Sequence, residues 1–196
     1  MTTHVTYDEL LARVRALAER LERPPVVGIS GHGGAGKSTL AARLAADLGV
    51  AEDQVVGTDS FHATTCGPGA GMWEQHDWAG LEAVVRSARG GADRLRYDYR
   101  WWSGETGTED QPMPAVLLVE GIRLLGDRTR DWFDLTVWLD LDPDAAGVRA
   151  VARNTEQGDD DAELDLWRTK WVPEGHTYEQ AERPLDRADL VLGALG

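Results

Sequence analysis

The 196-residue chain has few lysines, one cysteine and no long hydrophobic run. Its 20 basic residues include only two lysines, Lys37 and Lys170, so a lysine inside a motif is informative. The single cysteine, Cys66, cannot form an internal disulfide, which fits the reducing cytoplasm. The longest apolar run, 115–119, is far too short to span a bilayer. The first ten residues show no apolar run flanked by positive charge, so we expect no secretory signal and no membrane partner.

Positive charge is scarce overall. The chain carries 34 acidic and 20 basic residues, for a net charge of -14. This excludes a nucleic-acid binder that works by neutralising phosphates, because such proteins present a basic surface. A small anionic ligand is still allowed, since a few local cations can bind it. The length and the absence of repeats or linkers predict one domain spanning 1–196, and a homo-oligomer is left open.

The hydrophobic pattern predicts strands alternating with helices. Helices are expected over 6–22, 37–48, 79–88 and 144–153, and strands over 26–30, 54–58, 115–120, 134–141 and 189–192. The segment 63–75 is rich in Gly and Thr and predicts a loop, and 95–114 predicts a hairpin insertion. This alternation indicates a three-layer α/β fold with a mainly parallel sheet covered on both faces.

A glycine-rich segment connects the first buried strand to the second helix. It matches the phosphate-binding P-loop pattern and the P-loop NTPase fold, with glycines that let backbone N–H groups surround phosphate oxygens. Lys37 is expected to reach the β- and γ-phosphates, and the Ser38 hydroxyl to ligate Mg²⁺. No role is predicted for His32. A glycine-rich turn that binds nothing is the alternative. The residues expected to bind ATP in this segment are Gly31, Gly33, Gly34, Ala35, Gly36, Lys37, Ser38 and Thr39.

Other residues narrow the class of P-loop protein. A guanine-specific GTPase needs an Asn-Lys-x-Asp motif, but Asn154, the only asparagine, is followed by Thr155. Asp59 follows the second predicted strand, where ligands bind in open α/β sheets, and can accept a proton from a substrate hydroxyl. Glu120 ends the third strand at the same edge and can hold a metal-bound water. Either carboxylate can instead cap the next turn.

Four segments in this order resemble the uridine kinase family, whose relatives include phosphoribulokinase and bacterial pantothenate kinase. They are 27–39, 58–62 (Thr-Asp-Ser-Phe-His), 97–99 (Tyr-Asp-Tyr) and 119–122 (Val-Glu-Gly-Ile). The resemblance covers about 26–192. It implies an ATP-dependent phosphotransferase that acts on a hydroxyl of a small molecule, in uridine kinases the ribose 5′-hydroxyl. It also implies that Asp59 is the catalytic aspartate and Glu120 the Mg²⁺-associated glutamate.

The same resemblance suggests substrate-binding residues. Tyr97 and Tyr99 correspond to the family segment beside the nucleobase, and Asp77 to a carboxylate that binds ribose hydroxyls. His62 stands where the family has a tyrosine, and is included in the substrate-binding set. Arg100, Trp101 and Trp102 replace a nucleobase-contacting histidine. The acceptor is therefore expected to be a nucleoside or nucleoside-like compound, with pantothenate, a sugar or an antibiotic as alternatives. A nucleotide-binding sensor without acceptor is the alternative from another class.

A short lid is expected between residues 154 and 171. Arg149 and Arg153 lie one helical turn apart just before it, so they share a face. We expect Arg153 to stabilise the transferring phosphoryl group and Arg149 to bind the nucleotide. Arg168 and Lys170 are further candidates, and solvated surface charge is the alternative for all four. The five histidines show no metal-ligand spacing, so no zinc site is predicted.

Overall fold

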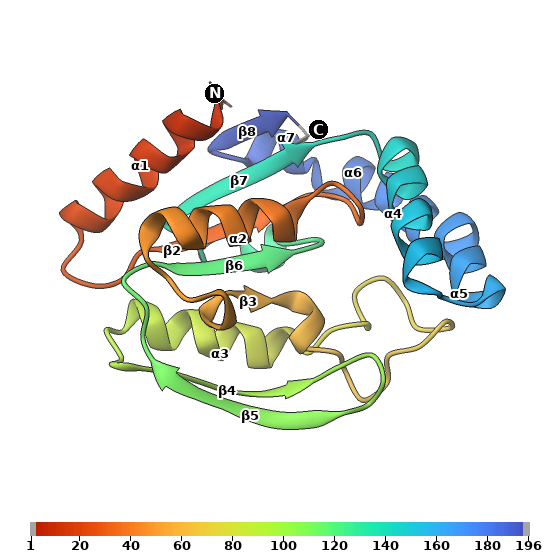
Figure 1. Ribbon diagram of the computed structural model, residues 1–196, viewed down its shortest axis with the longest axis horizontal. Coiled ribbons are helices and arrows are strands. Elements are labelled where there is room, and N and C mark those ends of the chain that lie inside the picture. Colours follow the sequence, from red (N-terminus) through yellow and green to blue (C-terminus); the bar gives the residue numbers. More distant parts are fainter. Residues whose placement is uncertain (1–2, 194–196) are drawn as a thin grey trace.

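The computed structural model describes residues 3–193 and has a six-stranded parallel sheet at its centre (Figure 1). The strand order is β1-β8-β7-β2-β6-β3, so β2 pairs with β6 on one side and with β7 on the other. The predicted domain 1–196 includes residues 1–2 and 194–196, which lie outside the described residues. The strands are β1 (Thr3–His4), β2 (Val26–Ser30), β3 (Val56–Gly57), β6 (Leu117–Gly121), β7 (Leu135–Asp140) and β8 (Leu190–Gly193).

Helices cover both faces of this sheet. The helices are α1 (Tyr7–Arg20), α2 (Lys37–Leu48), α3 (Trp78–Arg89), α4 (Pro143–Gln157), α5 (Asp161–Leu166), α6 (Val172–Glu182) and α7 (Pro184–Arg187). Successive residues of a strand point to opposite faces. Val137 of β7 packs in the core cluster formed with α1 and α2, whereas the next residue, Trp138, packs with Tyr178 of α6. The side chains of α3 pack on the same face as α6, against Val26 and Val119. The three-layer α/β fold is confirmed.

A two-stranded hairpin lies beside α3, outside the main sheet (Figure 1). Its antiparallel strands are β4 (Arg94–Arg100) and β5 (Thr106–Pro112), as expected for the insertion. Leu95 of β4 is buried among the side chains of α3, which fixes the hairpin to the body of the domain. The segment 63–75 contains turns and bends only, in agreement with the predicted loop.

The predicted bounds of helices and strands agree best with the structure where the sequence pattern is local. Strand β2 and helix α2 have the predicted bounds, and Thr6 caps α1 with Glu9 in a capping box. The predicted strand 54–58 is too long: only Val56–Gly57 pairs with β6, and 3-10 turns flank it at Glu52–Gln54 and Thr58–Ser60. This strand is the edge of the sheet, so a single neighbour holds it, and the chain turns immediately after Gly57.

The segment after α4 contains more helix than predicted. The acidic run at 159–161 begins α5, because the Asp160 side chain accepts a hydrogen bond from the Glu163 backbone N–H. A π-helical turn at Trp167–Trp171 connects α5 to α6. Within residues 3–193, no helix is both long and apolar enough to cross a membrane. Because all six strands are parallel, their carboxyl ends meet at one edge, and α4 and α5 lie beyond that edge (Figure 1).

Candidate active site

The P-loop turns tightly from β2 into α2. Gly34 and Gly36 have φ values of +90° and +98°, a region that residues with a side chain rarely adopt. A Cβ atom on Gly34 would also lie 2.1 Å from the backbone oxygen of Ala146 in α4. Gly36 precedes α2, and no side chain among the described residues caps it, so the first N–H groups of α2 can face an anion.

Lys37 is the first residue of α2 and is buried, with 8% of its surface exposed. Its Nζ donates a hydrogen bond to the backbone oxygen of His32 at 2.9 Å, which holds the ammonium inside the loop. Burial lowers the pKa of Lys37, and the positive charge of Arg153 acts in the same direction. The carboxylates of Glu120 and Asp59 oppose this pKa shift. The arrangement keeps a desolvated cation ready for an anionic ligand.

Two oxygen donors lie together beside the loop. The Ser38 hydroxyl donates to Oε1 of Glu120, the last residue but one of β6, at 3.1 Å. Burial raises the pKa of Glu120, and the charge of Lys37 opposes this increase. Gly121 must be small, because a Cβ there would lie 2.1 Å from Oγ1 of Thr58. A hydroxyl and a carboxylate oxygen at a P-loop fit Mg²⁺, which prefers hard oxygen ligands.

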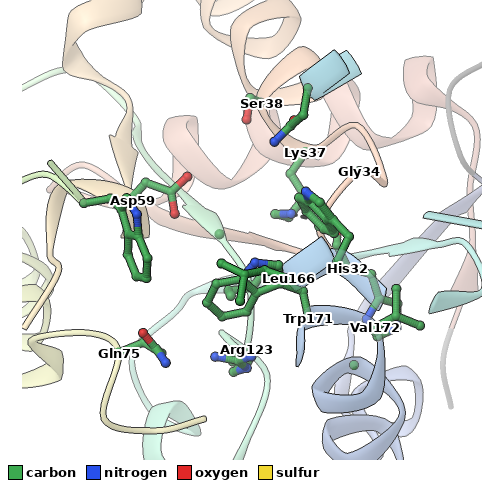
Figure 2. A pocket seen from close by; sticks show the side chains of 18 of the residues that line it. His32, Gly34, Lys37, Ser38, Asp59, Gln75, Arg123, Leu166, Trp171 and Val172 are labelled. Carbon is green, nitrogen blue, oxygen red and sulfur yellow. Dashed lines mark hydrogen bonds between the residues drawn. The ribbon is translucent and has the colours of Figure 1, made fainter. Parts of the chain in front are cut away.

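Asp59 lies in the 3-10 turn that follows β3, and its side chain is exposed. It lines a cavity of about 490 Å³ together with Lys37, Ser38 and Glu120. Figure 2 shows the Asp59 carboxylate and the Lys37 ammonium facing each other across this cavity. Asp59 reaches this position because β3 and β6 are parallel neighbours, so residues at their carboxyl ends come together.

The predicted lid, residues 154–171, forms another wall of the cavity. Arg153 lines the cavity, and its Nε and Nη2 donate to Oδ1 of Asn154 at 3.0 and 2.8 Å. Trp167 lies over the P-loop, because a Cβ on Gly33 would be 2.7 Å from its indole ring. Arg149 lies on the exposed side of α4, outside the cavity lining.

The two remaining candidate lid cations have protein partners. Arg168 pairs with Asp165 at 2.7 Å, and 79% of its side chain is exposed. Lys170 donates to the backbone oxygen of Ala70 at 2.5 Å and pairs with Glu174 at 3.2 Å. Lys170 therefore connects the lid to the loop 63–75, and neither residue lines the cavity.

The predicted substrate-binding residues separate into two groups. His62 lines both the main cavity and a neighbouring cavity beside the hairpin, whereas Asp77 and Tyr99 line only the neighbouring one. Asp77 caps α3, with Oδ1 accepting from the N–H of Gly80 at 3.0 Å. Tyr97 packs against Phe61, with ring centroids 5.2 Å apart, and burial raises its pKa to about 12. Among the predicted P-loop residues, the cavity is lined by Gly31, Gly33, Gly34, Lys37 and Ser38, but not by Ala35, Gly36 or Thr39.

Several cavity residues had no sequence signal. Gln75, His76 and Arg123 are buried and line the cavity. Figure 2 shows Gln75 and Arg123 in the wall opposite the P-loop. Gln75 donates to the backbone oxygen of Ala70 at 2.9 Å, and its Oε1 has no partner among the described residues. Arg123 has a φ of +62°, donates to the backbone oxygen of Met72 at 2.7 Å and pairs with Glu174. The two contacts of Arg123 join residues 51 positions apart in the chain, so no local pattern indicates them.

His32, the variable P-loop position, also has a clear structural place. Its Nε2 lies 2.9 Å from Oε1 of Glu179 in α6, and its ring packs edge-on against Trp138 at 5.2 Å. Burial lowers the pKa of His32, and the hydrogen bond and charge of Glu179 oppose this shift. The P-loop is thereby connected to the helix that follows the lid.

No family model matches the sequence. A curated uridine kinase from Limosilactobacillus reuteri is 25% identical over 185 residues, covering 87% of this chain and 84% of that protein. The crystal structure of a proposed fructose transport system kinase from a Silicibacter species superposes with a TM-score of 0.75 at 24% identity, covering 95% of this chain and 98% of the other. The structure of a proposed uridine kinase from Bacillus stearothermophilus superposes with a TM-score of 0.62 at 20% identity. The match covers 94% of this chain and 99% of the other.

The fold and the cavity define the class. The chain has a parallel sheet with a P-loop between β2 and α2, and it superposes on the two solved structures over most of their length. These features identify a three-layer α/β P-loop NTPase fold. The similarity to curated uridine kinases, at 25% identity, agrees with the resemblance that the sequence motifs imply. These relatives and structural neighbours are all named as kinases.

Proposed function

We propose that this protein transfers the γ-phosphoryl group of ATP to a hydroxyl of a small molecule, with Mg²⁺. One observation carries the proposal: Lys37, the Ser38–Glu120 pair and Asp59 line a single cavity although they come from three separate strand ends. A nucleotide-binding sensor without acceptor needs the first two features, but it has no need for a carboxylate facing them. Asp59 therefore favours the kinase over the sensor.

Each residue has a distinct part in the proposed reaction. The P-loop N–H groups and Lys37 hold the phosphates and stabilise the charge that develops on the transferred group. Ser38 and Glu120 would hold Mg²⁺, which neutralises phosphate charge when bound. Asp59 orients the acceptor hydroxyl and accepts its proton. Arg153 adds positive charge from the lid side of the cavity. Arg149 reaches the nucleotide only if α4 or the lid shifts, because it lies outside the cavity lining.

The acceptor we propose first is a nucleoside or nucleoside-like compound. The curated relatives named uridine kinase support it. Aromatic side chains in the cavity wall also support it, since a planar ring can stack on them. These are Trp101, Trp102, Trp167, Trp171 and Tyr178. The unpartnered Oε1 of Gln75 offers a hydrogen-bond acceptor in the same wall.

A second acceptor class is favoured by the placement of the tyrosines. Tyr97 packs in the core beside Phe61, and Tyr99 lines the neighbouring cavity, so neither lies where it could contact a base in the main cavity. A smaller polyhydroxylated acceptor, such as a sugar or pantothenate, needs no such contact. The cavity around Asp59 then supplies the acceptor subsite through His62, Gln75 and His76.

The test is an acceptor screen that measures ADP release with ATP and Mg²⁺ over nucleosides, sugars, pantothenate and aminoglycosides. We expect one class to raise ADP release well above the rate without acceptor. Lys37→Ala should lower turnover with that acceptor by at least about a hundredfold, because a charge in a dry site stabilises the transition state by several kcal/mol. A folded Lys37→Ala protein with near-normal turnover would contradict the P-loop assignment. If no acceptor is phosphorylated while ATP binds, the sensor becomes the better proposal.

We further propose that the protein acts in the cytoplasm and binds neither nucleic acid nor membrane. The single cysteine supports a reducing compartment, and the net charge of -14 disfavours phosphate backbones as partners. Its partner is the small-molecule acceptor. A homo-oligomer is compatible with this function and can be tested by measuring the mass in solution.

A further inference from the structure

We propose that Asp59, His62 and His76 form a Zn²⁺ site beside the P-loop, separate from the Ser38–Glu120 pair, and that Zn²⁺ bound there inhibits phosphoryl transfer. The site itself is independent of the proposed function, whereas the inhibition rests on it. We name this set of three residues the His-His-Asp cluster.

The geometry of the cluster is the first support. One ring nitrogen of each histidine and a carboxylate oxygen of Asp59 all lie within 4.8 Å of one another. His62 and His76 face each other as an isolated antiparallel bridge, and their ring centroids are 5.2 Å apart. Zn²⁺ binds such ligands at about 2.0–2.2 Å, so small side-chain rotations bring the three atoms onto one ion. The three residues also line the main cavity, which leaves a fourth position open.

The second support is the orientation of His62. Its Nδ1 lies 2.8 Å from the backbone oxygen of Asp59. A carbonyl oxygen only accepts, so Nδ1 carries the proton and Nε2 carries the lone pair. Metal-binding histidines commonly donate their other N–H to a backbone carbonyl in this way, which fixes the tautomer and the ring orientation. His62 is therefore preorganised to ligate through Nε2.

The third support is the state of His76. It is 6% exposed, and its buried Nδ1 has no hydrogen-bond partner among the described residues. An unpaired buried imidazole nitrogen costs free energy, and a ligand in the adjoining cavity can remove part of that cost. Burial lowers the pKa of His76, which favours the neutral ring, the form that binds metals. His62 and then Arg123 also lower the pKa of His76, and Arg123 is itself paired with Glu174.

The donor set selects the metal. Two imidazoles and one carboxylate suit zinc and neighbouring transition metals, whereas Mg²⁺ prefers oxygen ligands alone. The hydroxyl of Ser38 and the carboxylate of Glu120 form the oxygen-only pair in the same cavity. The cavity thus separates two kinds of divalent ion by ligand type. The spacing of His62 and His76 in the sequence does not indicate the cluster, because the two residues come together only when the loop 63–75 folds back.

Occupation of the cluster has a direct consequence for the reaction. The oxygen of Asp59 that ligates Zn²⁺ is no longer available to accept the proton of an acceptor hydroxyl. The ion also takes space where the acceptor must approach. We therefore expect micromolar-range Zn²⁺ to inhibit transfer without displacing ATP from the P-loop.

The binding test needs no nucleotide and no acceptor. Calorimetry with Zn²⁺, and visible absorption with Co²⁺ as a spectroscopic substitute, are measured on Cys66→Ser protein, which removes the only thiol. We expect one Zn²⁺ per chain and the d–d bands of low-coordinate Co²⁺. His62→Asn and His76→Asn should each weaken Zn²⁺ binding by about tenfold or more and remove the Co²⁺ bands. His176→Gln is the matched control, because His176 of α6 is not among the residues that line the cavity, and it should change neither signal.

The outcomes are distinct. If Zn²⁺ does not bind, or if all three histidine variants bind it equally, the His-His-Asp cluster is not a metal site. A His62→Asn protein that folds and loses binding supports the site even if His76→Asn fails to fold. Zn²⁺ binding without any kinase activity supports the site while contradicting the proposed function. If the rate of phosphoryl transfer is the same with and without bound Zn²⁺, the proposed inhibition is wrong. A change in the acceptor KM of His62→Asn without Zn²⁺ binding in wild type assigns the histidines to the acceptor subsite instead.

Discussion

Gly33 of the P-loop and Trp167 of the lid are in direct contact: a Cβ on Gly33 would lie 2.7 Å from two carbons of the indole ring. Trp167 belongs to the π-helical turn that connects α5 to α6. The contact closes one side of the phosphate-binding loop with a side chain of the lid. Any movement of the lid on ligand binding must therefore change the surroundings of Gly33.

The first prediction compares two neighbouring glycines. In Gly33→Ala the new methyl group meets the tip of a side chain on the lid, which can move, so we expect a loss of less than about 1 kcal/mol in the free energy of unfolding. In Gly34→Ala the methyl group meets the backbone oxygen of Ala146 at 2.1 Å, and φ is +90°. We expect Gly34→Ala to lose at least about 2 kcal/mol. Chemical denaturation of both variants measures the difference, and equal losses would contradict it.

The second prediction concerns the lid itself. We expect residues 154–171 to become ordered over the phosphates when ATP and acceptor bind, because closure excludes water from the reaction. Hydrogen exchange of this segment should slow in the ternary complex. Helix α2 beyond its first turn is the internal control, since its buried face should exchange slowly in every state. Unchanged exchange of 154–171 at saturating ligands would refute lid closure.

The sequence predicts much of the fold because its strongest signals are local. The buried run of β2, the glycines after it and the periodic leucines of α2 lie next to one another, so their bounds were predicted correctly. The edge strand β3 was predicted too long, since its apolar residues do not reveal how many neighbours it has. The common cavity of Asp59 and Glu120 follows from topology, because parallel strands end at one edge.

The rest of the site depends on contacts between distant parts of the chain. His32 meets Glu179 across 147 positions, and Arg123 meets Glu174 across 51. Neither pair has a spacing that any motif defines. Lys170, one of only two lysines, donates a hydrogen bond from the lid to the loop 63–75 and is not among the residues that line the cavity. Such pairs are visible only once the fold has brought them together.

The third prediction uses the buried position of His32. Burial lowers its pKa below the ordinary value of 6.5. At a pH below about 6.5 the unfolded chain protonates this histidine and the folded protein resists protonation, so acid should destabilise the fold. His32→Gln keeps a donor toward Glu179 and removes the titration. The unfolding free energy of wild type minus that of His32→Gln should fall as pH drops from about 6.5 toward 5, by at most about 1.4 kcal/mol per pH unit. Denaturant titrations across this range measure it, and a flat difference would show that burial does not depress this pKa.

The last prediction separates a kinase from a sensor through Asp59. Its carboxylate faces Lys37 across the cavity, whereas the P-loop and Lys37 hold the phosphates. Asp59→Asn keeps the shape of the side chain and removes its charge. We expect phosphoryl transfer to fall by roughly 10²–10⁴-fold, the usual contribution of a positioned base, while ATP affinity changes little. Calorimetry for ATP beside steady-state kinetics with the acceptor from the screen measures both quantities.

A matched variant makes this result specific. Asp140 also ends a strand at the same edge of the sheet, is exposed and lies outside the cavity lining. Asp140→Asn changes the net charge by the same amount as Asp59→Asn, so it should leave turnover within about twofold of wild type, as expected for a solvated surface charge. If Asp59→Asn retains full activity, Asp59 is not the base. If both variants lose activity equally, the loss comes from the change in net charge at this edge of the sheet. The assignment of proton transfer to Asp59 is then wrong.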